Sequence, residues 1–496
     1  MTNISPSGAD RLRRKELFLD DRFIDEKSGL IRRFHQPEVS AENPVIHADR
    51  PWERDAAFVD SGLVFYDEDE DLFKAWYQGG ACYGADDRSV MCYATSRDGI
   101  HWEKPALGQV EFEGSRENNI ALMAECMMHD PAVLIDEHDP DPQRRFKAVW
   151  WGGRKDAAQS DGYLLGHCVG FSPDGIRWTQ HPDNPVWPAD GEVAVPQGIH
   201  HCQDDRLVMY CSADGHGMRV VARCESDNFV NWETPPTLIF GYDEDDPPGT
   251  ELGGLAAINY DGTQIGMLWV IRNLPGFTKE QWKQIVDRNI RQGFLGPPIQ
   301  FNAAVCRTIQ TELVVSQDGQ SWQRINRDAP LLLMGTEGTW DECSSLAGRP
   351  FVAKDKIWIY YTGCGRISPT PETTRPEKIG KWSYDTGLAT LRLDGFASLH
   401  APDQGVLVTK PFHMQASALT VNTDAQPGSV RVEVLEPGGQ PLVGYSIDEA
   451  QVIDGDQLHA AVRWKTANVR DLRGRQIRLK LSLKNADLYS ISFLDQ

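Results

Sequence analysis

Short apolar runs recur through the first 400 residues, each bounded by Gly, Asp or Pro. The closest pair is 72–80 (LFKAWYQGG) and 145–153 (RFKAVWWGG), and looser versions follow at 206–210, 264–269 and 356–361. Runs of this length and composition, rich in aromatic and β-branched residues, predict β-strands. The pattern therefore indicates an all-β protein in which one unit is repeated five times.

A heptapeptide with the frame Ser-x-Asp-Gly-x-x-Trp follows four of these strands. Its copies are 96–102, 172–178, 226–232 and 316–322, and the third copy is degenerate. Asp-Gly favours a tight turn because Gly reaches positive φ, and Ser and Asp side chains can bond the turn amides. We therefore expect each copy to staple one strand to the next. The fifth unit closes instead at 391–396 (LRLDGF), which keeps only the Asp-Gly turn.

Radial repetition of small sheets is the arrangement that these repeats predict, namely a five-bladed β-propeller over residues 50–399. The expected blades are 50–107, 118–182, 192–236, 250–327 and 340–399. A helix is expected over 279–292, inserted in the fourth blade, because its apolar residues recur at helical spacing.

The two ends of the chain lack the heptapeptide. Residues 1–49 contain an expected hairpin, 17–33, which closes the ring or bridges two domains. Beyond residue 400, alternating strands predict a separate C-terminal β-sandwich over 400–496.

Charge and cysteine usage narrow the class of partner. The 496 residues carry 72 acidic against 50 basic side chains, a formal net charge of −22. Nucleic acids and anionic membranes reward clusters of Lys and Arg, so neither is expected as a partner. No apolar leader or membrane span is evident, and the 10 cysteines are scattered singly without a CxxC pair. These features favour a cytoplasmic protein with free thiols, no cofactor and a small ligand. They leave the oligomeric state open.

The repeated staples, the closing Arg-x-Asp-Gly-Phe strand and the appended sandwich resemble the five-bladed propeller glycoside hydrolases, the invertase/inulinase-like and arabinanase/xylosidase-like group. The resemblance covers nearly the whole chain and implies carboxylates at the centre of the propeller. It also implies a small carbohydrate or glycoside substrate, including furanosides. His129-Asp130-Pro131 stands where the invertase-like pattern has Arg-Asp-Pro, and Glu342-Cys343 imitates its Glu-Cys motif in a different blade. The Asn-Asp-Pro-Asn-Gly motif of that pattern is missing.

Glycoside hydrolysis requires two carboxylates that flank the scissile bond. In a propeller the innermost strand opens each blade, so the candidates are acids at the start of each unit's first strand. The candidate catalytic residues are Glu53, Asp130, Glu251, Asp341 and Glu342. Because Asp341 and Glu342 are adjacent, only one of them can face the axis from a strand. Each candidate also has a structural alternative, such as an Asx-Pro turn for Asp130 or a surface acid for Glu53.

Polar and aromatic residues near these acids are candidates for holding sugar hydroxyls. The third unit offers no acid at its start, only Gln197, His200 and His201. The full set of candidate substrate-binding residues is Arg54, Asp55, His129, Trp151, Gln197, His200 and His201. No metal site is expected, because adjacent strand residues point to opposite faces and a third ligand at a diagnostic spacing is lacking.

Three other functions remain open at this point. A non-catalytic sugar-binding propeller would not need paired acids. A glycoside phosphorylase would need basic residues for phosphate at the centre. A sialidase-like enzyme would need three arginines and six units, whereas five are visible.

Overall fold

The computed structural model describes residues 11–80, 89–159, 162–188, 193–201, 206–214, 219–233, 235–247, 250–273, 307–327, 329–336, 339–366 and 382–495. Regular structure in these ranges is β-strand, interrupted by the short 3-10 turns η1 (Pro51–Glu53), η2 (Pro142–Arg144) and η4 (Val469–Leu472). The protein is all-β, as the alternating pattern predicted. The helix expected over 279–292 lies outside the described residues. No helix in the described ranges is long and apolar enough to cross a bilayer.

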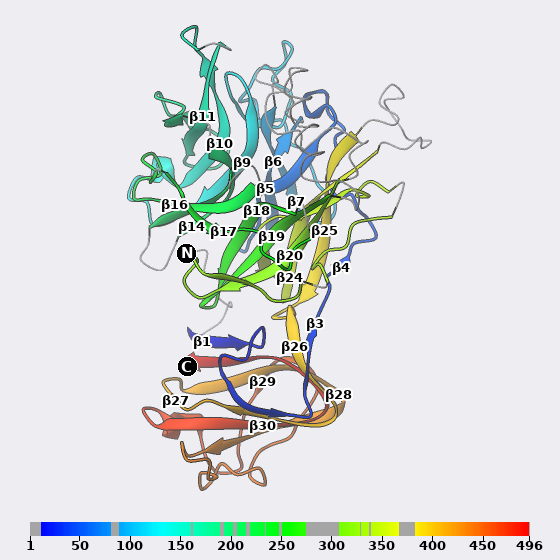
Figure 1. Ribbon diagram of the computed structural model, residues 1–496, viewed down its shortest axis with the longest axis vertical. Coiled ribbons are helices and arrows are strands. Elements are labelled where there is room, and N and C mark those ends of the chain that lie inside the picture. The colour runs from blue at the N-terminus through cyan, green and yellow to red at the C-terminus, as the bar shows by residue number, and fades with distance from the viewer. Residues whose placement is uncertain are drawn as a thin grey trace.

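Each of the first three repeated units forms one antiparallel sheet (Figure 1). The first contains β5 (Ala57–Asp67), β6 (Leu72–Gly79), β7 (Val90–Ser96) and β8 (Ile120–Met123). The second contains β9 (Met128–Ile135), β10 (Phe146–Lys155), β11 (Tyr163–Ser172), β12 (Thr179–Gln180) and β13 (Trp187–Pro188). The third contains β14 (Val193–His201), β15 (Leu207–Asp214), β16 (Arg219–Ser226) and β17 (Thr237–Phe240).

The fourth and fifth units share one nine-stranded sheet. Its strands are β18 (Glu251–Tyr260), β19 (Thr263–Asn273), β20 (Arg307–Ser316), β21 (Trp322–Arg324), β22 (Ser344–Ala347), β23 (Phe351–Ala353), β24 (Lys356–Arg366), β25 (Trp382–Arg392) and β4 (Glu38–Val39). In the strand pairing, the two halves are joined where β20 and β22 run parallel, through the register pair Ile309 and Ser344.

The heptapeptide turns have the geometry that their side chains predict. In the first copy, the Ser96 hydroxyl accepts the Gly99 amide at 2.9 Å. The Asp98 carboxylate accepts the amides of Ile100 and His101, both at 2.8 Å. The same bonds recur in the other three copies. In the degenerate copy Phe229 takes φ 66° where the others have Gly.

The turns also connect one unit to the next. Aromatic side chains on the second strand of a unit donate to the glycine carbonyl of a neighbouring turn: Trp76 to Gly175 at 2.6 Å, Tyr210 to Gly319 at 2.8 Å, and Tyr360 to Gly99 at 2.6 Å. These bonds link unit one to two, three to four, and five back to one. The units therefore follow one another around a ring.

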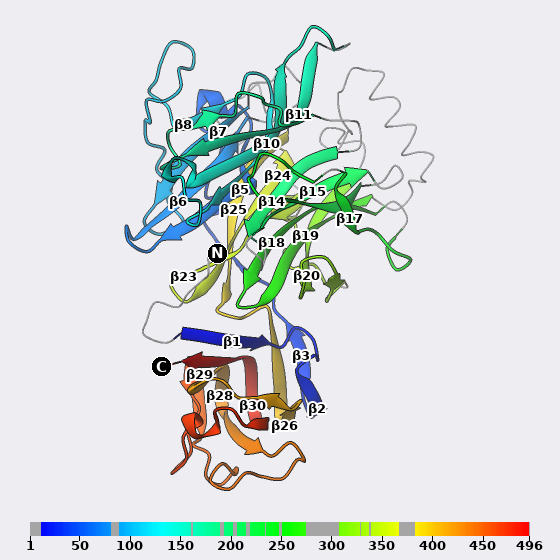
Figure 2. The same ribbon diagram turned by 90° about the vertical axis from the view of Figure 1, so that its left-hand side faces the viewer.

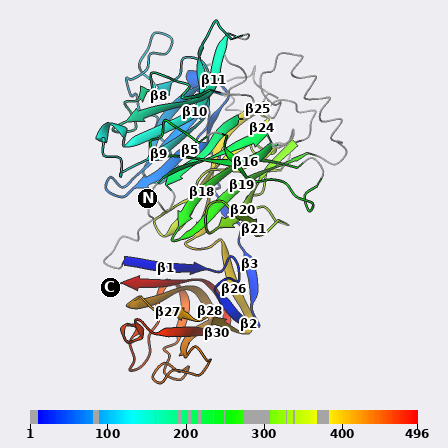
Figure 3. The same ribbon diagram turned by 60° about the vertical axis from the view of Figure 1, so that its left-hand side comes forward.

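The C-terminal residues form an eight-stranded sheet to which the N-terminal strands also belong. It contains β1 (Arg11–Leu17), β2 (Ile24–Ser28), β3 (Ile31–Phe34), β26 (Ala397–Thr409), β27 (Phe412–His413), β28 (Ala418–Leu435), β29 (Ile453–Ala461) and β30 (Gln476–Asp495). Figures 1 and 2 show β3 and β26 crossing from the upper sheets to this lower one. Figure 3 shows β1 along its upper edge, paired with β30.

A buried carboxylate joins the two parts of the molecule. Asp394, in the Asp-Gly turn that closes the fifth unit, is 2% exposed. It accepts hydrogen bonds from Tyr260 on β18 at 2.7 Å, Ser490 on β30 at 2.6 Å and Lys15 on β1 at 2.9 Å. Burial opposes its ionisation, but the Lys15 charge and these bonds hold the pKa of Asp394 below its usual value. The closing turn therefore anchors the lower sheet.

Candidate active site

The first strands of units one to four lie side by side. β5 packs against β9, β9 against β14, and β14 against β18. Their beginnings are also linked: the Asp130 amide donates to Gln78 at 2.8 Å, the Gly80 amide to Ala56 at 2.9 Å, and the Gln197 side chain to the Gly253 carbonyl. The polar residues that open these strands therefore gather at one end of the ring.

Asp130 occupies a strained position in β9. The pairing with β10 slips between Val149 and Trp151, so Asp130 and Pro131 form a bulge. Asp130 has φ 47°, a left-handed conformation that costs about 1–3 kcal/mol unless the surroundings enforce it. The side chain is 7% exposed, and among the described residues its Oδ1 accepts no hydrogen bond. Nδ1 of His129 lies 3.0 Å from that oxygen. Asp130 is thus a buried carboxylate with one oxygen that no hydrogen bond of the described structure engages.

An aromatic cluster lies on the strands next to His129. His129 is directly opposite Trp151 on the neighbouring strand, so the two share one face of the sheet. Trp151 is partly exposed and meets the edge of His167 at 5.4 Å between ring centroids. His167 in turn stacks on Trp187 at 4.6 Å. The exposed part of Trp151 offers an apolar surface on the face that it shares with His129.

Gln197 and Glu251 begin the inner strands of units three and four. Gln197 lies in a bulge of β14, and its Oε1 is buried without a hydrogen-bond partner in the described part of the chain. A Cβ at Gly254 would collide with the Gln197 side chain. That glycine therefore makes room for Gln197. Glu251, opposite Ile271, is 4% exposed.

The adjacent acids Asp341 and Glu342 have different surroundings. Asp341 accepts hydrogen bonds from the hydroxyls of Thr339 at 2.9 Å and Tyr361 at 3.3 Å, which are contacts internal to unit five. Glu342 is half-buried near Cys364. Burial above all, with a smaller contribution from Glu342, raises the pKa of the Cys364 thiol. The two adjacent acids therefore differ in exposure, with Asp341 buried and Glu342 half-buried.

Glu53 is engaged entirely within the fold. It is fully buried, and its Oε2 accepts the backbone amides of Asp49 and Arg50 at 2.9 Å each. Lys104 lies 2.7 Å from Oε1, and the Tyr77 hydroxyl donates to the same oxygen at 2.6 Å. This saturation fits a structural ion pair and leaves no acceptor for a substrate.

Arg54 and Asp55 follow Glu53 at the entrance of β5. Both side chains are half-buried, and Arg54 takes φ 54°. The Asp55 carbonyl accepts the Tyr384 amide at 3.1 Å, which ties unit one to unit five. The two residues thus lie beside the other strand beginnings, next to Gly80, whose nearest atoms include the Arg54 side chain.

His200 and His201 point to opposite faces of β14, as strand alternation predicted. His200 stacks on Tyr210 at 5.3 Å, and burial, reinforced by the charges of Arg349 and Arg223, lowers its pKa to about 3. It is therefore neutral at pH 7. His201 Nε2 lies 3.2 Å from Asp136, a contact that belongs to the packing of unit two against unit three. No group of three metal-ligating side chains occurs among the described residues.

Comparisons with known proteins add structural likenesses only. No family model and no curated protein sequence matches the chain. A Bombyx mori GH32 β-fructofuranosidase matches with TM-score 0.42 and 11% identity, covering 92% of this chain and 95% of that one. A second match is a GH130 structure, from a family of mannoside phosphorylases that contains glycoside hydrolases targeting β-1,2 mannosidic linkages in Candida mannan. It has TM-score 0.42 and 15% identity, and the match covers 73% of this chain and 94% of that one. An N-acetylgalactosamine deacetylase from F. plautii matches with TM-score 0.44 and 13% identity, over 74% and 97%.

Two titratable residues escaped the sequence-based selection. Arg349 follows β22 and donates to the Ile199 carbonyl at 3.1 Å, so its side chain reaches from unit five to unit three. Burial lowers the pKa of Arg349 to about 10, yet the residue keeps part of its exposure, and no carboxylate pairs with it among the described residues. Asp385 on β25 is 9% exposed, and burial raises its pKa to about 6. Neither residue belongs to a repeated motif that would have marked it.

Proposed function

We propose that the protein is a glycoside hydrolase whose carboxylates act at the beginnings of the inner strands. The observation that carries the proposal is Asp130, a buried acid on a strained bulge whose Oδ1 accepts no hydrogen bond in the described structure. Strain of this kind persists at sites where geometry serves function. Glu251 and Glu342 are the acids proposed to act with it.

The proposed architecture is a five-bladed propeller over residues 50–399 and a β-sandwich over 400–496. The ring of turn bonds supports the first, with β18–β21 and β22–β25 as blades four and five. For 1–49, the pairing of β1 to β3 with the lower sheet and of β4 with β25 supports a bridging segment. The free thiols of the described cysteines support a reducing, cytoplasmic setting.

In the proposed mechanism one carboxyl group protonates the departing oxygen while a second, ionised, acts as nucleophile or base. The first role needs an acid that carries a proton, and the second needs a neighbour that has lost its proton. Trp151 supplies a stacking surface for a sugar ring, and His129, Gln197 and Asp55 bind hydroxyl groups. Arg54 lies at the same entrance. A furanoside is the proposed substrate class within the group that the sequence resembles.

The proposal is tested by incubating the wild-type protein with a panel of aryl furanosides and aryl pyranosides and measuring release of the phenol. We expect turnover with at least one furanoside, accompanied by a free reducing sugar. A panel in which sugars bind but none is cleaved would instead favour the non-catalytic sugar-binding propeller.

Arg349 favours one alternative, phosphorolysis. A partly exposed arginine with no carboxylate partner in the described structure is suited to an oxyanion such as phosphate. The same glycoside panel, run with and without inorganic phosphate, separates the two reactions. Hydrolysis gives a free sugar in both conditions, whereas phosphorolysis gives a sugar phosphate only when phosphate is present.

A further inference from the structure

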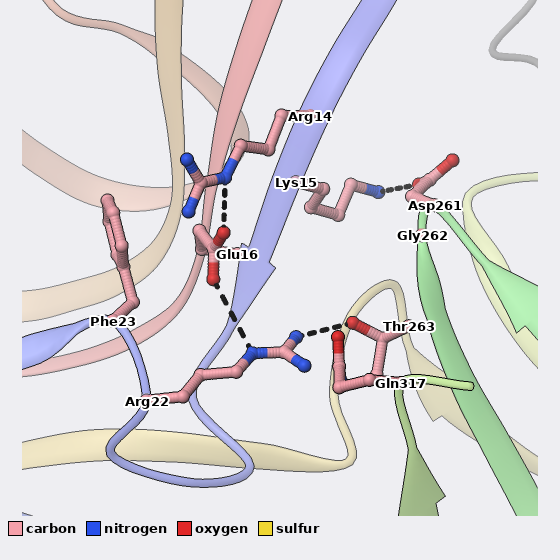
Figure 4. Close-up of a pocket in the computed structure, with 9 residues that line it drawn as sticks. All are labelled: Arg14, Lys15, Glu16, Arg22, Phe23, Asp261, Gly262, Thr263 and Gln317. Carbon is pink, nitrogen blue, oxygen red and sulfur yellow. Dashed lines mark hydrogen bonds and ion pairs between the residues drawn. The ribbon is translucent and has the colours of Figure 1, made fainter. Parts of the chain in front are cut away.

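A cavity of about 400 Å³ lies between the lower sheet and the fourth unit, away from the proposed catalytic residues. Figure 4 shows side chains from β1, from the turn that follows it, and from the β18–β19 turn meeting around this space. The lining residues are Arg14, Lys15, Glu16, Arg22, Phe23, Asp261, Gly262, Thr263 and Gln317. The volume falls within the range of about 300–1,000 Å³ that is usual for small-molecule sites.

In one wall of the cavity, the charged side chains are paired with one another. Lys15 lies 2.8 Å from Asp261 and 2.9 Å from Asp394, and only 10% of its side chain is exposed. Burial opposes the charge of Lys15, but the two carboxylates raise its pKa, so it stays protonated at neutral pH. These ion pairs therefore connect the lower sheet to the ring. The charge of Lys15 is already paired and is not available to a ligand.

The opposite wall carries unsatisfied polar atoms. Glu16 is 5% exposed; its Oε1 accepts Arg14 Nε at 2.5 Å, while Oε2 accepts no hydrogen bond among the described residues. Arg22 donates to the Thr263 hydroxyl at 2.6 Å, and its Nη1 is likewise buried without a partner in that part of the chain. Arg22 Nε is 3.9 Å from Glu16 Oε2, so the open acceptor and the open donor belong to neighbouring groups.

This pair of open groups limits the chemistry of a ligand. A small anion would satisfy Arg22 and be repelled by Glu16, and a small cation would have the reverse problem. A hydroxyl group both donates and accepts, so vicinal hydroxyls can satisfy the two groups together. The Phe23 ring adds an apolar face beneath the Arg14 guanidinium, which lies 4.7 Å from its centroid.

We propose that this junction cavity is a second carbohydrate site, which binds a neutral mono- or disaccharide through Glu16, Arg22 and Thr263. The site does no chemistry. Because β1 and the β18–β19 turn form its two sides, a bound sugar also stabilises the contact between the lower sheet and the ring.

The test is calorimetric binding of glucose, fructose and sucrose to a protein that carries Asp130→Asn and Glu251→Gln. These changes suppress the proposed turnover, so the result does not depend on whether the protein is a hydrolase. Citrate and spermidine serve as charged comparators. We expect saturable binding of at least one sugar, weakened roughly tenfold or more by Arg22→Met or Glu16→Gln. Asp69→Asn, in an exposed loop, should leave the affinity unchanged.

A milder variant and a crystal structure keep the proposal testable if Arg22→Met or Glu16→Gln unfolds the protein. Thr263→Val keeps the shape of the site while removing the hydroxyl that positions Arg22, and it should weaken sugar binding with little change in melting temperature. A crystal soaked with the best-binding sugar should show it against Glu16 and Arg22. The proposal is overturned if no sugar binds, if only citrate or spermidine binds, or if binding is indifferent to all three substitutions.

Discussion

Glu53 and Asp130 are two buried acids at the beginnings of neighbouring inner strands, and their carboxylates have different hydrogen-bond partners. Glu53 accepts two backbone amides and contacts Lys104 and Tyr77 at 2.7 and 2.6 Å. Asp130 has a strained backbone, and its Oδ1 accepts no hydrogen bond among the described residues. Burying a carboxylate is costly unless it is compensated. The acid whose two oxygens are both bonded within the fold is therefore assigned to structure, and the acid with an oxygen that accepts no hydrogen bond is assigned to chemistry.

Substitutions of the other proposed catalytic acids give the largest expected effect. At least one of Glu251→Gln and Glu342→Gln should reduce glycoside turnover by about 10²–10⁴-fold, the usual cost of lost acid–base catalysis. The melting temperature should stay equal or rise, because a converging negative charge has been removed. Turnover and melting curves are measured together, with Asp69→Asn as the loop control. Full activity in both variants would remove these acids from the site.

Glu53→Gln should behave in the reverse manner. Among the described residues, the change leaves the buried Lys104 with Asp49, at 2.7 Å, as its remaining carboxylate partner. Breaking a buried ion pair costs about 3–5 kcal/mol, so the free energy of unfolding should fall by an amount of that order. Any lost activity should follow the folded fraction in denaturant titrations. A variant that is fully stable yet inactive would indicate that Glu53 is a catalytic residue.

Asp385 is an intermediate case, because burial raises its pKa to about 6 while the Ala48 amide at 3.1 Å compensates only in part. A raised folded-state pKa means that stability is retained below the unfolded value of about 3.9 and lost as the pH rises through about 6. Asp385→Asn should remove that loss and add about 2–3 kcal/mol at pH of about 8. Near pH 4 the two proteins should be equally stable. Denaturant titrations at both pH values measure the free energy of unfolding. A gain in stability that is the same at both would contradict the raised pKa of Asp385.

The staple turns give the smallest expected effect. Ser96→Ala removes the acceptor of the buried Gly99 amide and should cost about 1 kcal/mol. Glycoside turnover should not change, because these turns lie at the ends of strands away from the proposed acids. Thermal melting measures the effect, and Ser115→Ala in an exposed turn is the control. An activity loss larger than the stability loss would weaken the division between structural and catalytic regions.

The repeated turns were predictable because their bonds are local. Ser96, Asp98 and Gly99 lie within four positions, and their residue types dictate the hydrogen bonds. The β-strands followed from alternation for the same reason. The pairing of β1 with β30 and the role of Asp394 joined segments hundreds of residues apart, and alternation alone does not fix such partners.

Residues of the candidate site could be selected from the sequence, but their surroundings could not. The rule that inner strands open the units selected Asp130, Glu251 and Gln197. It selected Glu53 as well, because nothing local reveals that Lys104, 51 positions further on, saturates that acid. Arg349 was missed since its significance depends on reaching a strand of another unit.

The most direct test of the account compares Asp130→Asn with Glu53→Gln in one experiment, recording phenol release from the best aryl glycoside and thermal melting on the same samples. The account predicts that Asp130→Asn melts at or above the wild-type temperature while turnover falls about 10²–10⁴-fold. It predicts that Glu53→Gln melts lower while the folded protein remains active. Wild-type turnover in folded Asp130→Asn would contradict the account.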